Sequence, residues 1–178
     1  MATRGALRRI AVVASPIDRS RGLLAVGGGG LVPCALGRAG ITRRKREGDG
    51  ATPAGTLRPV LAWWRPDRVT RPVTRLPTAP IRPDSAWCDD PADRNYNRAV
   101  RLPFAASHER LWRDDHLYDL CVVLDWNLDR PVAGAGSAIF LHLAAPGFTP
   151  TAGCIAVTEP AMRRLLSLAT TETYFDTG

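Results

Sequence analysis

A histidine and a cysteine near the C-terminal end of the chain are the residues best placed for covalent chemistry. Residues 137–144 form an apolar, strand-like run that carries His142, and Cys154 opens a second such run. The connector between the runs is rich in proline and glycine, which predicts a chain reversal and an antiparallel pair. His142 and Cys154 are equally distant from Phe148 in sequence, so this pairing would place them opposite each other, with Cβ atoms roughly 4.5 to 5.5 Å apart.

A cysteine beside a histidine supplies a nucleophile and a base. The imidazole of His142 would take the proton of Cys154, and the thiolate is the reactive form. Gly153 has no Cβ, so its amide and that of Cys154 could point at an acyl oxygen and form an oxyanion hole. The alternative is a core histidine and a small buried cysteine, which describes most such residues.

The motifs around this pair resemble those of a known family. Residues 151–154, Thr-Ala-Gly-Cys, resemble the Ser/Thr-x-Gly-Cys signature that follows a histidine in the L,D-transpeptidase catalytic-domain family. Residues 45–55 resemble a Thr-Pro-x-Gly turn of that family, and residues 95–98 and 134–142 resemble segments of one of its subgroups. The resemblance implies that Cys154 is the nucleophile and His142 the general base, with no metal or organic cofactor.

The chain departs from the family pattern at two places. The family commonly has a second histidine just before Gly-Cys, where this chain has Ala152, and often an arginine shortly after the cysteine, where it has Ala156 and Val157. That arginine would hold a substrate carboxylate, so another cation is expected to replace it. Arg98 is the candidate.

Other residues are expected to bind the substrate. Tyr96, Asn97 and Arg98 offer an aromatic ring, an amide and a cation that could orient a peptide, although a solvated turn fits the same residues. Thr151 belongs to the cysteine motif. The family places an aromatic residue near the nucleophile from a neighbouring strand, and Tyr118 could fill that position.

The composition predicts a globular protein without a metal site. The chain has 178 residues, of which 45% are hydrophobic, and is expected to form a single catalytic domain over residues 1–178. Its four cysteines are widely spaced without a C-x-x-C pair, so a zinc site is not expected. The net charge of +7 favours anionic partners. No nucleic-acid-binding motif accompanies it, and the basic run at residues 43–46 is interpreted as a solvated loop.

The elements that position these residues are predicted to be mainly β. We expect antiparallel sheets that form a β-sandwich or partly open barrel of the L,D-transpeptidase type, with strands at residues 9–14, 21–26, 31–36, 56–64 and 118–126 in addition to the two runs above. A short mid-chain helix is expected at residues 107–113, and a second helix, after the cysteine, at residues 160–169. Residues 65–93 contain six prolines and are predicted to be a long loop that could cover the cleft.

The location of the protein is open at this point. Arg4, Arg8 and Arg9 precede an apolar run at residues 10–14 that is too short for a signal peptide, and no run is long enough for a transmembrane helix. The cell envelope or periplasm is expected if the family role holds, and the cytoplasm otherwise.

The leading functional hypothesis is a cysteine acyltransferase that forms a thioester with a peptidoglycan stem peptide and passes it to an amine or to water. Two alternative functions are compatible with the same residues. One is a cysteine amide hydrolase, similar to an L,D-carboxypeptidase, acting on another peptide. The other is a non-catalytic module that binds a polyanion through its positive charge. The expected partners are peptidoglycan stem peptides, and no nucleic acid is expected.

Overall fold

The first three strands form an antiparallel meander, as the sequence predicted. The computed structural model describes residues 7–27 and 29–178, so Arg4 lies outside the described residues. Strands β1 (Leu7–Ala14), β2 (Arg21–Val26) and β3 (Gly30–Ala35) pair in sequence order. Buried and exposed side chains alternate along β2, because one face of the meander packs against the core and the other faces solvent.

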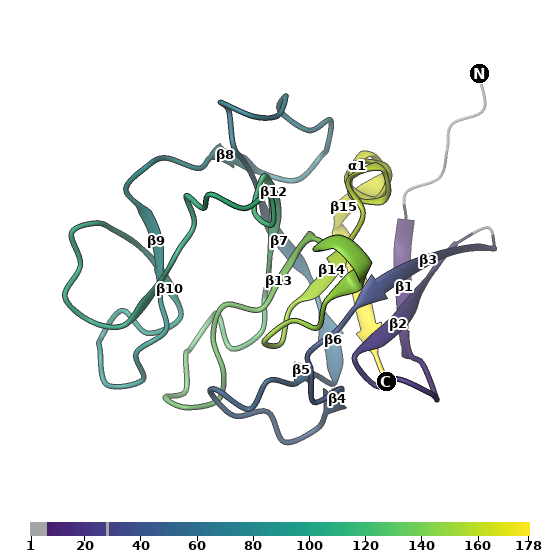
Figure 1. Ribbon diagram of the computed structural model, residues 1–178, viewed down its shortest axis with the longest axis horizontal. Helices are drawn as coiled ribbons and strands as arrows, with labels where there is room; N and C mark the ends of the chain where they lie inside the picture. The colour runs from purple at the N-terminus through teal and green to yellow at the C-terminus, as the bar shows by residue number, and fades with distance from the viewer. Residues whose placement is uncertain (1–6, 28) are drawn as a thin grey trace.

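The meander is one part of a ten-stranded mixed sheet that curls into a half-barrel (Figure 1). Its strand order is β6-β15-β1-β2-β3-β14-β13-β12-β7-β8. The further strands are β6 (Gly55–Leu57), β7 (Pro59–Trp64), β8 (Thr78–Pro80), β12 (Leu120–Leu124), β13 (Phe140–Leu143), β14 (Ile155–Val157) and β15 (Ala169–Thr177). The mainly β fold class is confirmed. Most neighbouring strands of this sheet are antiparallel, as expected, but three pairs, β1 with β15, β7 with β8 and β13 with β14, are parallel.

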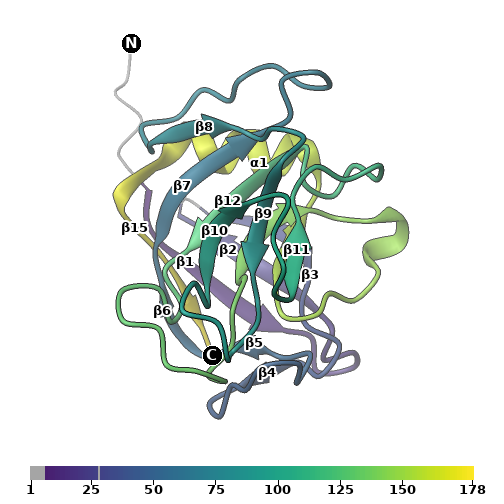
Figure 2. The same ribbon diagram turned by 90° about the vertical axis from the view of Figure 1, so that its left-hand side faces the viewer.

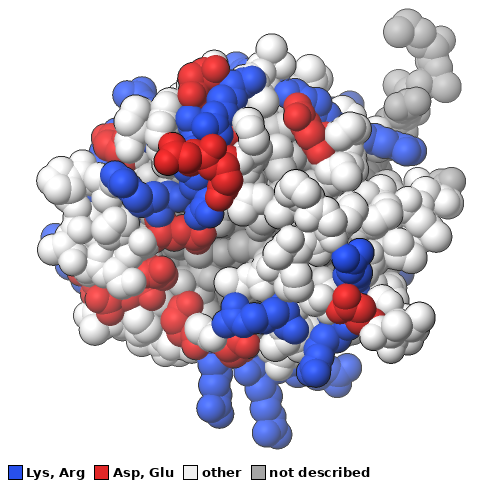
Figure 3. Space-filling view, viewed as in Figure 1, with Lys and Arg blue, Asp and Glu red and all other residues white. Residues whose placement is uncertain are grey.

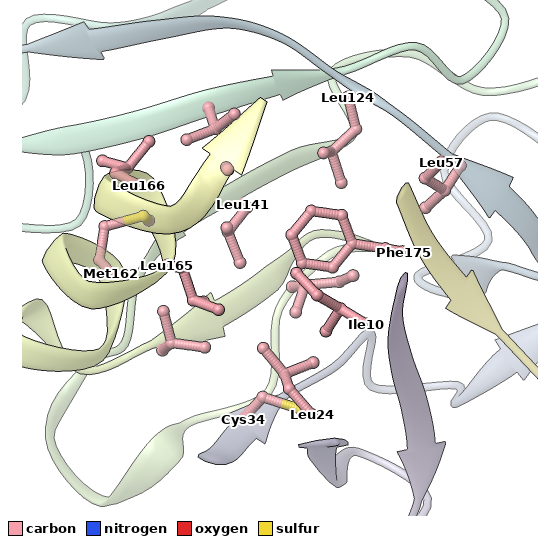
Figure 4. Packing of buried hydrophobic residues seen from close by; sticks show 14 of the residues in the cluster. Ile10, Leu24, Cys34, Leu57, Leu124, Leu141, Met162, Leu165, Leu166 and Phe175 are labelled. Atoms are coloured by element: carbon pink, nitrogen blue, oxygen red, sulfur yellow. The ribbon is translucent and has the colours of Figure 1, made fainter. Parts of the chain in front are cut away.

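Helix α1 (Glu159–Leu168) packs on the sheet and confirms the predicted C-terminal helix. Thr158 precedes it at the N-cap and a proline occupies its first turn, where no backbone donor is lost. Met162, Leu165 and Leu166 lie on one face and belong to the same buried cluster as side chains of the meander, of β12 and β13, and of β15 (Figure 4). The main hydrophobic core therefore lies between α1 and the sheet.

A second, smaller sheet packs against β13, β12 and β7 (Figure 2). It consists of β9 (Ser85–Cys88), β10 (Arg98–Arg101) and β11 (His108–Arg110), with β9 in the middle. Trp87 of β9 meets Phe140 of β13 edge to face, with ring centroids 5.3 Å apart. This contact joins the two sheets beside the cysteine.

The expected mid-chain helix at residues 107–113 was wrong, since residues 108–110 form β11. A segment this short cannot hold a helix by local propensity alone. His108 instead pairs with Cys88 of β9, and Leu111 is buried in the second core. Tertiary pairing therefore overrides the local signal.

Two further features complete the fold. Strands β4 (Ile41–Thr42) and β5 (Thr52–Pro53) form a small parallel pair around the loop of residues 43–51. The proline-rich segment 65–93 contributes β8 at the edge of the main sheet, where proline is tolerated, and then β9. In the part of the chain that the structure describes, no helix is long and apolar enough to span a bilayer.

Candidate active site

His142 and Cys154 lie on adjacent strands that run parallel. His142 of β13 pairs with Ala156 of β14, so the predicted antiparallel hairpin was wrong. The connector turns through a short 3-10 helix (Pro146–Phe148), and then Thr151 is held beside the segment that follows β3. The Thr151 amide donates to the Leu36 carbonyl at 2.9 Å, and the Arg38 amide donates to the Thr151 carbonyl at 2.9 Å. These bonds return the chain to the starting end of β13.

Both side chains nevertheless face the same side of the sheet. Leu141 pairs with Ile155, which places Cys154 beside Phe140, two residues before His142 on the same face. The two side chains are therefore diagonal neighbours across the β13–β14 pair. His142 and Cys154 both line one cavity of about 550 Å³ between the main sheet and the smaller one. The structure therefore brings the predicted pair together, diagonally and not face to face.

The Cys154 thiol is buried and both accepts and donates a hydrogen bond. It accepts the Phe140 amide at 3.3 Å and donates to the Ala138 carbonyl at 3.2 Å. Burial raises the pKa of this thiol to about 12, and the nearby Glu109 carboxylate adds to the rise, whereas the Phe140 amide and Lys45 lower it. The resting cysteine is therefore a neutral thiol that needs a base.

The hydrogen bonding of His142 leaves one ring nitrogen able to accept a proton. Its Nδ1 lies 2.8 Å from the Leu143 carbonyl, which can only accept, so Nδ1 carries the proton and Nε2 is free to accept one. The Tyr118 ring packs edge-on against the imidazole, with centroids 5.2 Å apart. Burial lowers the pKa of His142 to about 4, so the imidazole is neutral at pH 7.

The predicted oxyanion hole is only partly available. Gly153 has φ +148°, and a Cβ there would lie 2.9 Å from the Ala51 carbonyl oxygen, so only glycine fits. Its amide donates to Thr151 Oγ1 at 3.1 Å, and that hydroxyl in turn donates to the Cys154 carbonyl at 2.7 Å. The Gly153 amide is therefore already occupied in this structure, contrary to expectation, while a role for the Cys154 amide stays a prediction.

The predicted substrate-binding residues separate into two groups. Tyr118 and Thr151 line the cavity, and the Tyr118 hydroxyl donates to Glu109 at 2.5 Å. Tyr96 lies behind the cavity wall, where its hydroxyl donates to Glu47 and accepts the Gly136 amide.

Asn97 and Arg98 hold the framework and do not line the cavity. Asn97 is 1% exposed, and its side-chain oxygen accepts the indole N–H of Trp87 and the amide of Ala138, both at 3.0 Å. Arg98 donates to the carbonyls of Leu128 and Asp129. The expectation that Arg98 reaches the cleft was wrong, because its guanidinium is directed to the backbone of another loop.

Comparison with known proteins agrees with this geometry. The family model described as the L,D-transpeptidase catalytic domain matches residues 12–174, nearly the whole chain. The chain belongs to the L,D-transpeptidase catalytic-domain family. Members of this family act on peptidoglycan in the cell wall. Searches of curated proteins and of solved structures found no match.

Several charged residues of this L,D-transpeptidase-type cavity carry no local sequence signal of their own. Six charged side chains line the cavity in addition to the predicted residues: Arg38, Lys45, Glu47, Asp89, Glu109 and Arg113. Asp89 is the contribution of the proline-rich segment to the lining. Lys45 and Glu47 fall within the family-like segment 45–55, which was the one signal that could have marked them.

The basic run at residues 43–46 is solvated except at one residue. Arg43, Arg44 and Arg46 are exposed, but the Lys45 side chain is only 3% exposed and points into the cavity. Among the described residues, no three His, Cys, Asp or Glu side chains are grouped to hold a metal ion.

Proposed function

We propose that this chain is a cysteine acyltransferase that acts on peptidoglycan stem peptides. The donor would be a tetrapeptide stem whose last amide bond joins a diamino acid to D-alanine. Cys154 would attack that carbonyl, and the acyl group would pass through a thioester to an amine of a second stem or to water. This reaction is covalent catalysis by an activated thiol.

His142 would transfer a proton in both stages of the reaction. His142 Nε2 takes the thiol proton as sulfur forms its bond to the carbonyl carbon, and returns it to the D-alanine nitrogen as the C–N bond breaks. In the second stage Nε2 takes a proton from the incoming amine or water. The new bond then forms, the C–S bond breaks, and the cysteine leaves as a thiolate that is protonated again.

The observation that carries this proposal is that one cavity holds both the protonated thiol of Cys154 and the neutral imidazole of His142. A neutral thiol beside a neutral imidazole with a fixed Nδ1–H is the starting state that proton transfer to Nε2 requires. Both groups are buried, so the ion pair that forms during transfer is poorly solvated. A bound substrate that excludes water and supplies the reacting carbonyl would complete the site.

Arg38 is proposed to bind the substrate carboxylate in place of Arg98. Arg38 lines the cavity, its backbone amide bonds the Thr151 carbonyl, and its guanidinium lies beside Gly50. Within the described part of the chain this guanidinium forms no side-chain hydrogen bond or ion pair. A stem tetrapeptide ends in a carboxylate, for which a free guanidinium is the matching partner.

The carboxylate contact can be tested with paired donors. Arg38→Gln should weaken acylation by a carboxylate-bearing donor tenfold or more, roughly 1.4 kcal/mol, and spare the amidated donor. Arg98→Gln is the matched control and should affect both donors equally or neither. Equal losses on both donors for Arg38→Gln would assign it a structural role.

The reaction itself is tested by incubating the protein with a stem tetrapeptide and measuring intact mass. We expect a covalent adduct on Cys154 with loss of D-alanine, absent in Cys154→Ala. Crosslinked dimers in the products identify an amine acceptor, and tripeptide alone identifies hydrolysis. Absence of any adduct or product with stem peptides would contradict the proposal and leave an amide hydrolase of other specificity or a binding module.

A further inference from the structure

Lys45 is the only lysine in a chain whose other 23 basic residues are arginine. It is also the buried member of an exposed basic run, with a side chain that is 3% exposed. Arginine and lysine differ here in shape, because an ammonium is a compact charge and a guanidinium is a broad plane. The one position with a lysine is the one that enters the cavity of Cys154.

Gly136 and Gly153 leave space for the Lys45 side chain because they have no Cβ. A Cβ on Gly136, at φ +96°, would lie 3.0 Å from both Cγ and Cε of Lys45. A Cβ on Gly153 would lie 3.6 Å from Lys45 Nζ. These glycines belong to the segments that carry His142 and Cys154. Lys45 Nζ therefore lies against the residue that precedes the nucleophile.

The ammonium is held in a fixed position. Nζ donates to Asp49 Oδ1 at 2.5 Å and to the Arg46 carbonyl at 3.0 Å. Asp49 is itself fixed by the amides of Arg46 and Ala51, at 2.8 and 2.9 Å. An ammonium has three donors, and these two bonds leave one for the cavity.

We propose that Lys45 is a catalytic residue whose ammonium stabilises the negative charge that develops on Cys154 Sγ and on the substrate carbonyl oxygen during attack. It supplies a donor that the occupied Gly153 amide does not. The inference rests on the proposed cysteine chemistry but not on peptidoglycan as the substrate.

The charges around the thiol are consistent with this role. The titratable groups around Cys154 are Lys45, Glu109, Tyr118 and His142, which line the cavity, and Cys121, which lies in the buried cluster beside it. Burial and Glu109 raise the pKa of Cys154, and Lys45 is the cation that lowers it. Arg113, the other cation on that side, is paired with Asp115 at 2.6 Å.

The test is the pH dependence of Cys154 alkylation by iodoacetamide, a small neutral reagent that needs no peptide site. Lys45→Met keeps the apolar stem and removes the charge. We expect it to raise the apparent pKa of alkylation, seen as slower alkylation at a fixed pH of about 8, and to slow acylation by stem peptides at neutral pH about a hundredfold. Arg44→Met, an exposed neighbour, should leave both unchanged.

A second variant keeps the inference testable if Lys45→Met fails to fold. Asp49→Asn retains the ammonium and removes its counter-charge, so the apparent pKa of alkylation should fall. An unchanged or higher pKa in Asp49→Asn, or an unchanged alkylation profile in folded Lys45→Met, would overturn the role of Lys45. A Lys45-dependent alkylation profile without any reaction on stem peptides would instead overturn the proposed substrate alone.

Discussion

Burial moves the pKa values of Cys154 and His142 apart. The pKa of Cys154 rises to about 12 and that of His142 falls to about 4, in both cases chiefly because the charged form loses its hydration. At neutral pH the pair is a thiol and an imidazole and not a preformed ion pair. In the proposed reaction, attack would therefore depend on groups that stabilise charge only as it develops, which is the role that we propose for Lys45.

Access distinguishes Cys154 from the other core cysteines. Cys34 and Cys121 are 1% and 0% exposed and do not line the cavity, whereas Cys154 is 8% exposed and does. We expect brief iodoacetamide labelling of the folded protein to modify Cys154 first, as measured by peptide mapping. Equal labelling of the three cysteines would contradict the site, and labelling after unfolding in urea is the control for intrinsic reactivity.

The depressed pKa of His142 predicts how stability depends on pH. The folded pKa is about 4 and the unfolded one about 6.5, so between these values the unfolded chain binds a proton that the folded chain does not. The free energy of unfolding should therefore rise with pH through this window. It should be fully recovered above the unfolded pKa.

His142→Gln removes this dependence. Between pH 7 and pH 5 the wild type should lose roughly 2 kcal/mol more stability than the variant, measured by urea unfolding at both pH values. The variant should also lose acylation while remaining folded. Parallel pH profiles for the two proteins would show that His142 is not buried in its neutral form.

At the scale of elements, Asn97 joins the smaller sheet to the loop before β13. Its side chain bonds Trp87 and Ala138 on one side and the carbonyls of Trp126 and Asn127 on the other. Asn97→Ala would leave these buried groups unpaired, so we expect a loss of about 3 kcal/mol in the free energy of unfolding. Urea denaturation measures it.

The same substitution should also disturb the position of the Cys154 thiol. Ala138 supplies the carbonyl that holds the Cys154 thiol, so Asn97→Ala should reduce acylation even where the protein is still folded. Asn95→Ala is the matched control, because among the described residues the Asn95 side chain bonds only Asp93, two residues earlier. Equal stability of the two variants would remove Asn97 from the framework of the site.

The elements that the sequence predicted well are those whose pattern is local. The meander strands alternate apolar and polar residues, and α1 repeats apolar residues at helical spacing. The direction of β14 was missed because it depends on Thr151 bonding a segment more than a hundred residues earlier, which no local pattern records. Strand β15 was overlooked, although its run of threonines with Tyr174 and Phe175 is typical of a strand.

In the candidate site, too, the residues marked by a local motif were predicted, and those placed by contacts between distant segments were missed. Cys154 and His142 were predicted from residue type and motif, and both line the cavity, whereas Arg98 was placed in the site by sequence proximity to a motif and lies elsewhere. Lys45 was missed because a run of basic residues is usually solvated. Its burial depends on the space left by Gly136 and Gly153, which meet only in the folded chain.

At the scale of the whole molecule, the charge of +7 is not gathered on the face shown in Figure 3. Basic and acidic side chains are interspersed there, and the cavity itself carries three of each sign. A surface of this kind fits a substrate with both ammonium and carboxylate groups better than a uniform polyanion.

The last strand, β15, joins the N-terminal meander to β6. A substitution in it therefore tests whether residues 1–178 form one cooperative unit. Strand β15 lies between β1 and β6, and Phe175 pairs with Ile10 on one side and Leu57 on the other, all three being buried (Figure 4). Phe175→Ala should cost about 3 to 5 kcal/mol, a large share of the stability of a typical domain.

All five tryptophans lie between residues 63 and 126, far from Phe175 in sequence, so they report on a different part of the chain. In a single domain, Phe175→Ala should shift the urea midpoint of tryptophan fluorescence and of far-UV circular dichroism together. Glu172→Ala, at an exposed position of the same strand, should shift neither. A fluorescence transition that stays at the wild-type midpoint while the circular dichroism transition moves would show that the two ends of the chain unfold separately from its middle.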